Sequence, residues 1–363
     1  MEQDNDSAGR EVGSAVPWEV RTSASQLASG QERLEPFLFN GYNLRMFNGV
    51  YAIFRGRIEL ILPLLAAWLA REAAVDEPVV SSLAREALAD SGLYRQGSVV
   101  RASLRGLGSA LDLPRETLRR AITELDEQGW LIRADGEMPL PGPRSHEYLR
   151  RGLYAERLRD FLWTAERIEE FYERRPIPAG RVGEIERAIR ACRVADLPPG
   201  LQDGVMLPPS DSVAARQAAV VVAGYNLRQI IAVRGLLGGD ALLGVILGEI
   251  AHHSHAVLTS SHPATNWDEL MSRLSDEALM RARHDGRARA CTAHSLALSM
   301  DVPAETMRRK LKRLMEYGWV ERDEDGRFWP PTAGLTRPFE AFNRPRFEDF
   351  RRSAARVRTL IAA

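Results

Sequence analysis

The chain carries nearly the same seventeen residues twice, and this repeat constrains its fold more than any other feature. The string PRETLRRAITELDEQGW runs from Pro114 to Trp130, and PAETMRRKLKRLMEYGW runs from Pro303 to Trp319. Outside the two strings, the same offset of 189 residues aligns Leu107 with Leu296, Asp112 with Asp301, and Arg133 with Arg322. Upstream, the pentapeptide GYNLR recurs at an offset of 183. Similarity at a fixed spacing indicates internal duplication, so we expect two copies of one unit.

The repeat divides the chain of 363 residues into four predicted segments. Residues 1–33 are polar, small and aperiodic, as in a disordered N-terminal tail. Residues 34–175 form repeat 1 and residues 211–363 form repeat 2. Residues 176–210, rich in proline and glycine, form the linker, with a short helix predicted within RVGEIERAIRACR.

Each repeat is predicted to begin with helices that are apolar nearly all round, over 42–54 and 57–74 in the first copy and 225–239 and 240–253 in the second. Helices of this kind are buried or packed against a partner. We therefore expect the two sets to pack together around a pseudo-twofold axis, as in a dimer made from a single chain. A polar helix follows near 81–95 and 267–284, and an amphipathic helix closes each copy near 153–174 and 345–361.

The repeated core has the order helix, tight turn, helix, strand, turn, strand. Leu118, Ile122 and their neighbours mark the buried face of the second helix, which we expect to contain Pro114 in its first turn and to end at Gly129. Trp130 and Trp319 are expected at the base of the strands, in the core. This order is typical of a winged helix-turn-helix. The fold class is therefore mainly α (α+β), a duplicated helical body bearing two winged heads.

A winged head presents the free face of its second helix to the DNA major groove. Hydroxyl, guanidinium and ammonium groups on that face, at the start of the first helix and on the wing are the candidate DNA-binding groups. They are Arg101, Ser103, Arg115, Thr117, Arg119, Arg120 and Arg133 in the first head, and Thr292, Thr306, Arg308, Arg309, Lys312, Arg313, Arg322 and Arg327 in the second.

The run LPRETLRRAITELDEQGWL resembles the recognition helix of GntR-type regulators, whose usual pattern is Ser-Arg-x-Thr-Val-Arg-x-Ala-Leu. The resemblance implies DNA contacts by Arg115, Thr117 and Arg119. In the second copy Thr306 and Arg308 match, but alanine replaces the first arginine. The order of the flanking helices resembles that of MarR-type regulators, where such helices form the dimer interface. Both families usually carry one head per chain, whereas two are predicted here.

The two predicted heads differ in net charge, although the net charge of the whole chain is zero. The 49 basic residues balance 49 acidic ones, so bulk charge gives no attraction to nucleic acid or membrane. The first seventeen-residue string has three arginines against four carboxylates, while the second has five basic residues against two. We therefore expect the second head to supply more phosphate attraction and the first to contribute relatively more base reading.

Several other residues allow both a functional and a purely structural interpretation. His252, His253, His255 and His262 could bind a metal, but a polar helix end is the favoured interpretation, and no metal or other cofactor is predicted. Cys192 and Cys291 form no CxxC pair and indicate a reducing compartment. Four apolar-helix residues, Met46, Trp68, Trp163 and Tyr225, could line an effector pocket but are favoured as core. Motifs for nucleophilic, metal or nucleotide chemistry are absent from the sequence, so an enzyme is not expected.

The expected function is a sequence-specific DNA-binding transcriptional regulator that reads a pseudo-palindromic site on double-stranded DNA. The alternatives are a plasmid-type replication initiator with two winged domains and a protein-interaction scaffold built from winged domains. The sequence does not identify a small-molecule effector, and it allows a homodimer formed through the apolar helices. The sequence predicts no membrane span and a cytoplasmic, nucleoid-associated protein.

Overall fold

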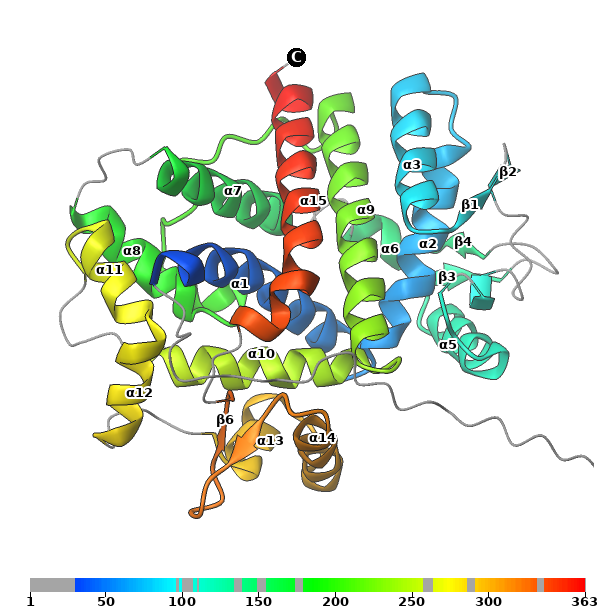
Figure 1. Cartoon of the computed structure of the whole chain (residues 1–363). Helices are drawn as coiled ribbons and strands as arrows, with labels where there is room; N and C mark the ends of the chain where they lie inside the picture. The colour runs from blue at the N-terminus through cyan, green and yellow to red at the C-terminus, as the bar shows by residue number, and fades with distance from the viewer. Residues whose placement is uncertain are drawn as a thin grey trace, which may run out of the picture.

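The computed structural model describes residues 30–95, 98–99, 107–109, 111–133, 139–148, 155–173, 179–256, 264–285, 291–331 and 336–362. The fold is mostly helical, with three two-stranded antiparallel sheets in the described part (Figure 1). The first half contains α1 (Gly30–Ile53), η1 (Ile58–Leu60), α2 (Ile61–Ala73), α3 (Pro78–Asp90), β1 (Tyr94–Arg95), β2 (Ser98–Val99), α5 (Arg115–Glu127), β3 (Leu131–Ile132), β4 (Leu140–Pro141), α6 (Pro143–Tyr148) and α7 (Leu158–Tyr172).

The remaining elements follow in the same general order. They are α8 (Ala179–Arg190), η3 (Val194–Asp196), α9 (Val213–Leu236), α10 (Ala241–Ala256), α11 (Trp267–Leu274), α12 (Asp276–His284), α13 (Ala293–Ser299), α14 (Ala304–Glu316), β5 (Glu321–Arg322), β6 (Phe328–Trp329) and α15 (Thr336–Ala362). Helices α1 and α9 are each 24 residues long, and α5 and α14 are each 13. Helices thus lie at the apolar segments that the sequence predicts, but α1 and α9 each begin 12 residues before the predicted starts at 42 and 225. Helix α1 therefore begins within the segment 1–33 that was predicted as a disordered tail, and the helix predicted near 267–284 is divided into α11 and α12.

The first helix of each half packs against helices of the other half. Helix α9 lies against α2 and α3, while α1 lies against α10 and α11. In Figure 1, α9 stands between α15 and the α2–α3 pair, and α10 runs beneath α1. The two apolar segments therefore form one common core, because neither has a polar face to turn toward water.

Four aromatic rings occupy the centre of this core. Tyr42, Phe161, Tyr225 and Phe350 come from α1, α7, α9 and α15, and each ring centroid lies within 6.0 Å of the other three. Most of these contacts are edge-to-face or tilted, the arrangement that aromatic pairs prefer. Tyr225, Met46, Trp68 and Trp163 are all buried in the core.

Two arginine–aspartate pairs tie the first helix of each half to the last. Arg45 donates to Asp160 from Nε at 2.9 Å and from Nη2 at 2.8 Å, with both side chains fully buried. Arg228 makes the same two-pronged contact with Asp349, at 2.9 and 2.8 Å. Such forked pairing fixes the angle between two helices more strictly than apolar contact does.

The segment 176–210, predicted as a linker, contributes a packed helix. Helix α8 lies against α1, α10 and α11. Its Glu186 is 1% exposed and accepts hydrogen bonds from the Ala264 amide at 2.7 Å and from Arg273 Nη1 at 2.9 Å. This segment therefore belongs to the body of the protein as well as joining the two halves.

Helices α9 and α10 are separated by a sharp bend. Gly238 and Gly239 have φ of 61° and 86°, a region that residues with a side chain rarely adopt. No single helix in the described residues is long and apolar enough to cross a membrane. The α9–α10 pair has that composition only when taken together, across a bend of 92°.

Candidate nucleic-acid interface

Helix α5 follows a left-handed residue and a proline. Asp112 has φ of 50°, and Pro114 has φ of −53° with ψ of 137°, so the chain turns and is extended just before the helix. The prediction that Pro114 lies in the first helical turn is wrong by one residue, because its extended ψ makes it the residue before the helix. Leu118, Ala121, Ile122 and Leu125 form the buried face, and the opposite face is exposed.

Helix α14 begins in the same way. Asp301 has φ of 53°, and Pro303 has φ of −53° with ψ of 132°. Met307, Leu311 and Leu314 are buried, so the inner face again repeats at helical spacing. Ahead of it, α13 is linked to α14 by the four residues 300–303.

Both helices end as the sequence predicts. Gly129 and Gly318 have φ of 74° and 71°. The next amide, of Trp130, bonds Leu125 O at 2.8 Å, and that of Trp319 bonds Leu314 O at 2.9 Å. These are the positive-φ residue and the long backward bond of a glycine-terminated helix. Both tryptophans are buried, at 2% and 4% exposure.

A short hairpin follows each helix. Strand β3 pairs with β4, and β5 pairs with β6, which also bridges to Cys291 ahead of α13. In the second hairpin Trp329 Nε1 donates to Asp323 Oδ2 at 2.8 Å. Although burial opposes ionisation, this bond and one from the Arg327 amide lower the pKa of Asp323. The carboxylate therefore stays charged and holds the turn closed.

The exposed face of α5 carries its basic residues in a network around one carboxylate. Arg119 and Arg120 both donate to Glu116, with closest distances of 2.8 and 2.9 Å. Those hydrogen bonds lower the pKa of Glu116 to about 2. Arg115 is exposed beside this network, and Thr117 is half-buried. The four predicted contact residues on α5 thus lie outside its buried face, but two of the arginines are internally paired.

The exposed face of α14 is divided between free and engaged cations. Arg309 is exposed and has no ion-pair partner among the described residues, while Arg308 pairs with Glu305 at 3.0 Å. Lys312 is 76% exposed and lies 3.9 Å from Glu316. Thr306 is half-buried on the same helix.

Two further cations of α14 point to the helical body instead. Lys310 forms an ion pair with Asp240, and Arg313 lies 3.9 Å from the same carboxylate while donating to Tyr317 Oη at 2.9 Å. Arg313 was predicted to contact DNA, and its guanidinium, 41% exposed, is shared between Asp240 and Tyr317. The charge difference between the two exposed helix faces is therefore smaller than the sequence suggests.

The remaining predicted residues lie around the helices. Thr292 caps α13, since its hydroxyl accepts the Ser295 amide at 3.0 Å. Arg133, Arg322 and Arg327 are exposed at the hairpins, with Arg322 stacked 5.8 Å from the Phe328 ring and Arg327 3.5 Å from Asp325. Arg101 and Ser103 lie outside the described residues.

Body residues that sequence reasoning missed hold the first head in place. Arg234, from α9 of the other half, donates to Leu111 O at 2.5 Å and to Asp112 O at 3.1 Å. Arg57 Nη1 contacts Glu124 on α5 at 2.8 Å. Nothing in the spacing of Arg57 or Arg234 reveals these contacts, because both depend on how distant elements meet.

The histidines at the end of α10 have ordinary structural surroundings. His252 is fully buried and lies edge-on to Phe37. His253 lies 3.6 Å from Glu249, and this contact raises its pKa. The described residues hold no group of three or more metal-ligating side chains. The side chain of His255 and the whole of His262 lie outside the described part of the chain.

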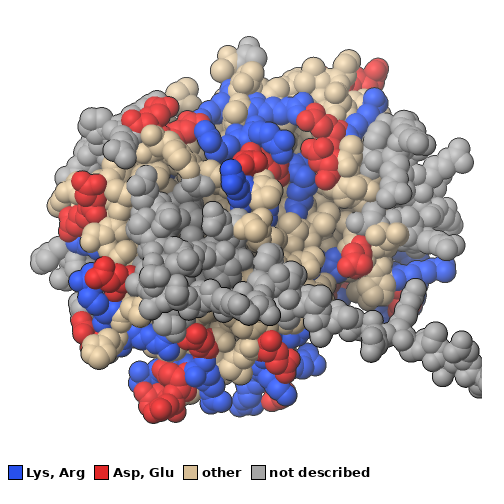
Figure 2. All heavy atoms as spheres, viewed as in Figure 1, with Lys and Arg blue, Asp and Glu red and all other residues tan. Residues whose placement is uncertain are grey.

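Surface charge is mixed on the face that carries the second head. Figure 2 shows Lys and Arg next to Asp and Glu over α14 and the β5–β6 hairpin, at the bottom of the view. A second group of basic side chains covers the upper part of α15 and α9. Several of the cations there are paired, among them Arg356 with Glu86 and Arg358 with Glu169.

No protein-family model, curated protein or solved structure matches this chain.

Proposed function

We propose that the protein is a sequence-specific DNA-binding transcriptional regulator, in which two winged helix-turn-helix heads of one chain read an imperfect inverted repeat. One observation carries the proposal. Helices α5 and α14 have equal length, an aspartate of positive φ two residues before the proline that precedes each helix, the same glycine exit, an apolar inner face and an exposed face that carries arginines. A helix held by one face leaves the other available to a major groove about 12 Å wide.

The helical body supports a fixed relation between the heads. Its core contacts are reciprocal between the halves, as at the interface of a twofold dimer. Heads related in this way suit half-sites related by a local twofold in the DNA. A duplicated chain keeps this geometry and allows each head to diverge, which agrees with the different charge of their helices.

The proposal is tested by selecting bound sequences from a random duplex library with the full chain. We expect enrichment of an imperfect inverted repeat, and affinity for it on the order of 10³-fold or more above random DNA. Arg115→Gln on α5 should relax the sequence preference, whereas Arg352→Gln on α15 is the control for loss of an exposed charge elsewhere.

The other outcomes separate the alternatives. Enrichment of direct repeats would favour a replication initiator, whose sites need not be palindromic. Retention of no DNA at all would exclude both and favour a protein-interaction scaffold. Equal binding of every sequence would leave a non-specific DNA-binding protein and contradict base reading by these helices.

A further inference from the structure

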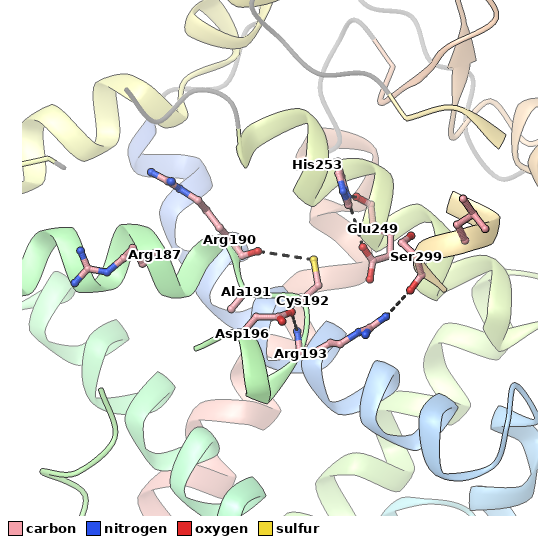
Figure 3. A pocket seen from close by; sticks show the side chains of 10 residues that line it. Arg187, Arg190, Ala191, Cys192, Arg193, Asp196, Glu249, His253 and Ser299 are labelled. Atoms are coloured by element: carbon pink, nitrogen blue, oxygen red, sulfur yellow. Dashed lines mark hydrogen bonds and ion pairs between the residues drawn. The ribbon is translucent and has the colours of Figure 1, made fainter. Parts of the chain in front are cut away.

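A pocket of about 590 Å³ lies where three parts of the chain meet. One wall is the end of α8 and the turn after it, a second is α10, and the third is the end of α13 in the second head (Figure 3). Its volume falls within the range of small-molecule sites, roughly 300 to 1,000 Å³. The size is therefore that of a metabolite and not of a single ion.

Three arginines line the α8 side of the pocket. Arg187, Arg190 and Arg193 recur at every third residue, so they follow one side of the helix and its extension. Arg187 is exposed and has no partner among the described residues. The Nε of Arg190 is buried without a hydrogen-bond partner, although its Nη2 lies 3.3 Å from Glu186. Guanidinium donors thus remain unused at this wall.

The carboxylates that line the same pocket already have partners. Glu249 accepts from Asn48 Nδ2 at 2.7 Å and faces His253 at 3.6 Å. Asp196 accepts from the Arg193 amide at 3.0 Å. The groups of the pocket that still lack hydrogen-bond partners are therefore the N–H donors of its arginines. Forked guanidinium donors match the oxygens of phosphate and carboxylate groups.

The thiol in the pocket has a packing role. Burial and the neighbouring Glu249 raise the pKa of Cys192 far above that of a free thiol. A thiol held in its protonated form is a poor nucleophile and metal ligand. Cys192 therefore does not act as a nucleophile in the proposal made below.

The pocket is connected directly to the second head. Arg193, which lines the pocket, donates from Nη2 to the carbonyl of Ser299, the last residue of α13. A bound anion would compete with that carbonyl for the same guanidinium. Helix α13 packs on α14, so a change at Ser299 reaches the candidate recognition helix.

We propose that this pocket binds a small polyanion through phosphate or carboxylate groups, and that its occupancy changes the DNA affinity of the second head. The second clause rests on the proposed function, while the first does not. Allosteric coupling of this kind typically changes affinity by about 5- to 150-fold.

Binding is tested by calorimetry on the full chain with pyrophosphate and, separately, with citrate, at an ionic strength held constant with NaCl. We expect at least one of them to bind, and the preferred probe identifies phosphate or carboxylate as the recognised group. Arg187→Gln combined with Arg190→Gln should weaken the Kd by about tenfold or more, because charge-assisted bonds are lost. Arg181→Gln, an exposed arginine on the same helix outside the pocket, should change it by less than about twofold.

Binding of neither probe, or equal binding by the double variant and the wild type, would overturn the site. The coupling is measured by fluorescence anisotropy of labelled DNA with and without the bound probe. Arg193→Gln should retain part of the anion binding and lose the effect on DNA. Anion binding without any DNA binding would sink the proposed function but leave the pocket, whereas DNA binding unaffected by a bound anion would overturn the coupling.

Discussion

The hydroxyl of Tyr42 donates a hydrogen bond to Asn226 Oδ1 at 3.1 Å, between residues 184 positions apart. The reverse contact is also present, because Tyr225 donates to Asn43 Oδ1 at 3.0 Å. All four residues belong to the repeated GYNLR strings, and all are buried. A pair of reciprocal bonds between equivalent positions of the two GYNLR strings is the pattern expected at a local twofold axis.

We expect Tyr42→Phe and Tyr225→Phe to lower the free energy of unfolding by similar amounts, about 1–3 kcal/mol each, since each leaves a buried amide oxygen unpaired. Urea denaturation measures both. Tyr172→Phe is the control, because Tyr172 is 49% exposed on α7. A large loss at one tyrosine and none at the other would contradict equivalence of the two contacts.

The two forked arginine pairs should differ in their contribution. Asp160→Asn leaves Arg45 as an uncompensated buried charge, which costs about 3–5 kcal/mol. Asp349→Asn should cost less, because Asp349 and Arg228 retain 14% and 17% exposure against 0% and 2% for Asp160 and Arg45. Chemical denaturation of the two variants gives the order, and the opposite order would show that water access is not what separates them.

Replacement of Gly129 or Gly318 by alanine should destabilise each head by about 1 kcal/mol through the backbone alone. A methyl group at either position meets no atom within 4 Å, so only the positive φ opposes it. Gly235→Ala is the matched control and should raise the stability instead of lowering it. Gly235 is an exposed residue within α9, has equally open surroundings and does not have a positive φ. Thermal melting distinguishes the three variants.

His252 should make the protein less stable in mild acid. Burial lowers its pKa from 6.5 to about 4, helped by Arg45 and His253 and opposed by Glu249. The folded state therefore favours the neutral ring, and the stability it supplies is present above the unfolded pKa near 6.5 and is lost as pH falls toward 4. Between about pH 7 and about pH 5 the loss is about 2 kcal/mol.

Urea titrations of wild type and His252→Gln at these two pH values isolate this contribution, which the variant should lack. His253 is the internal control of opposite sign. Contact with Glu249 raises its pKa, so its contribution is present in acid and lost as pH rises. His253→Gln should consequently increase the loss of stability at low pH, and equal slopes in all three proteins would refute the assignment.

The carboxylate between the arginines of α5 should restrain DNA binding. Glu116→Gln releases Arg119 and Arg120 from their ion pairs, so we expect tighter binding to all sequences and a steeper dependence on salt. Glu305→Gln should act similarly on Arg308 in the second head. A salt titration of anisotropy on selected and random DNA is the measurement.

The two heads should respond differently to loss of arginine. Neutralising Arg308 and Arg309 should flatten the salt slope by about 0.9 per lost phosphate contact and weaken all sequences alike. Replacing Arg115 and Arg119 should cost about 1–3 kcal/mol per lost base contact, mainly on the specific site. Because Lys310 and Arg313 are held by Asp240, we expect a smaller asymmetry than the string charges indicate. Identical salt slopes and identical loss of discrimination would mean that the heads are equivalent.

Local patterns in the sequence predicted the buried faces and the ends of the repeated helices, but not where α1 and α9 begin. The apolar periodicity of Leu118, Ile122 and Leu125 located the buried face of α5, and the glycine after each repeated helix located its end. These features depend on neighbours within about one turn, so a short string contains the information. The position of Pro114 was wrong by one residue for the same local reason, since only its ψ separates the first turn from the residue before it.

Tertiary structure decided which groups are available to a partner. Arg313 and Lys310 look the same in the sequence as Arg309 and Lys312, yet two face Asp240 and two face solvent. The pocket between α8, α10 and α13 likewise joins residues from positions 187 to 299. The spacing of the arginines in this pocket can be read from the sequence, but the residues of α10 and α13 that face them cannot. Helical periodicity determines which side of a helix is apolar, whereas the pairing of charges depends on distances between elements that only the packed chain sets.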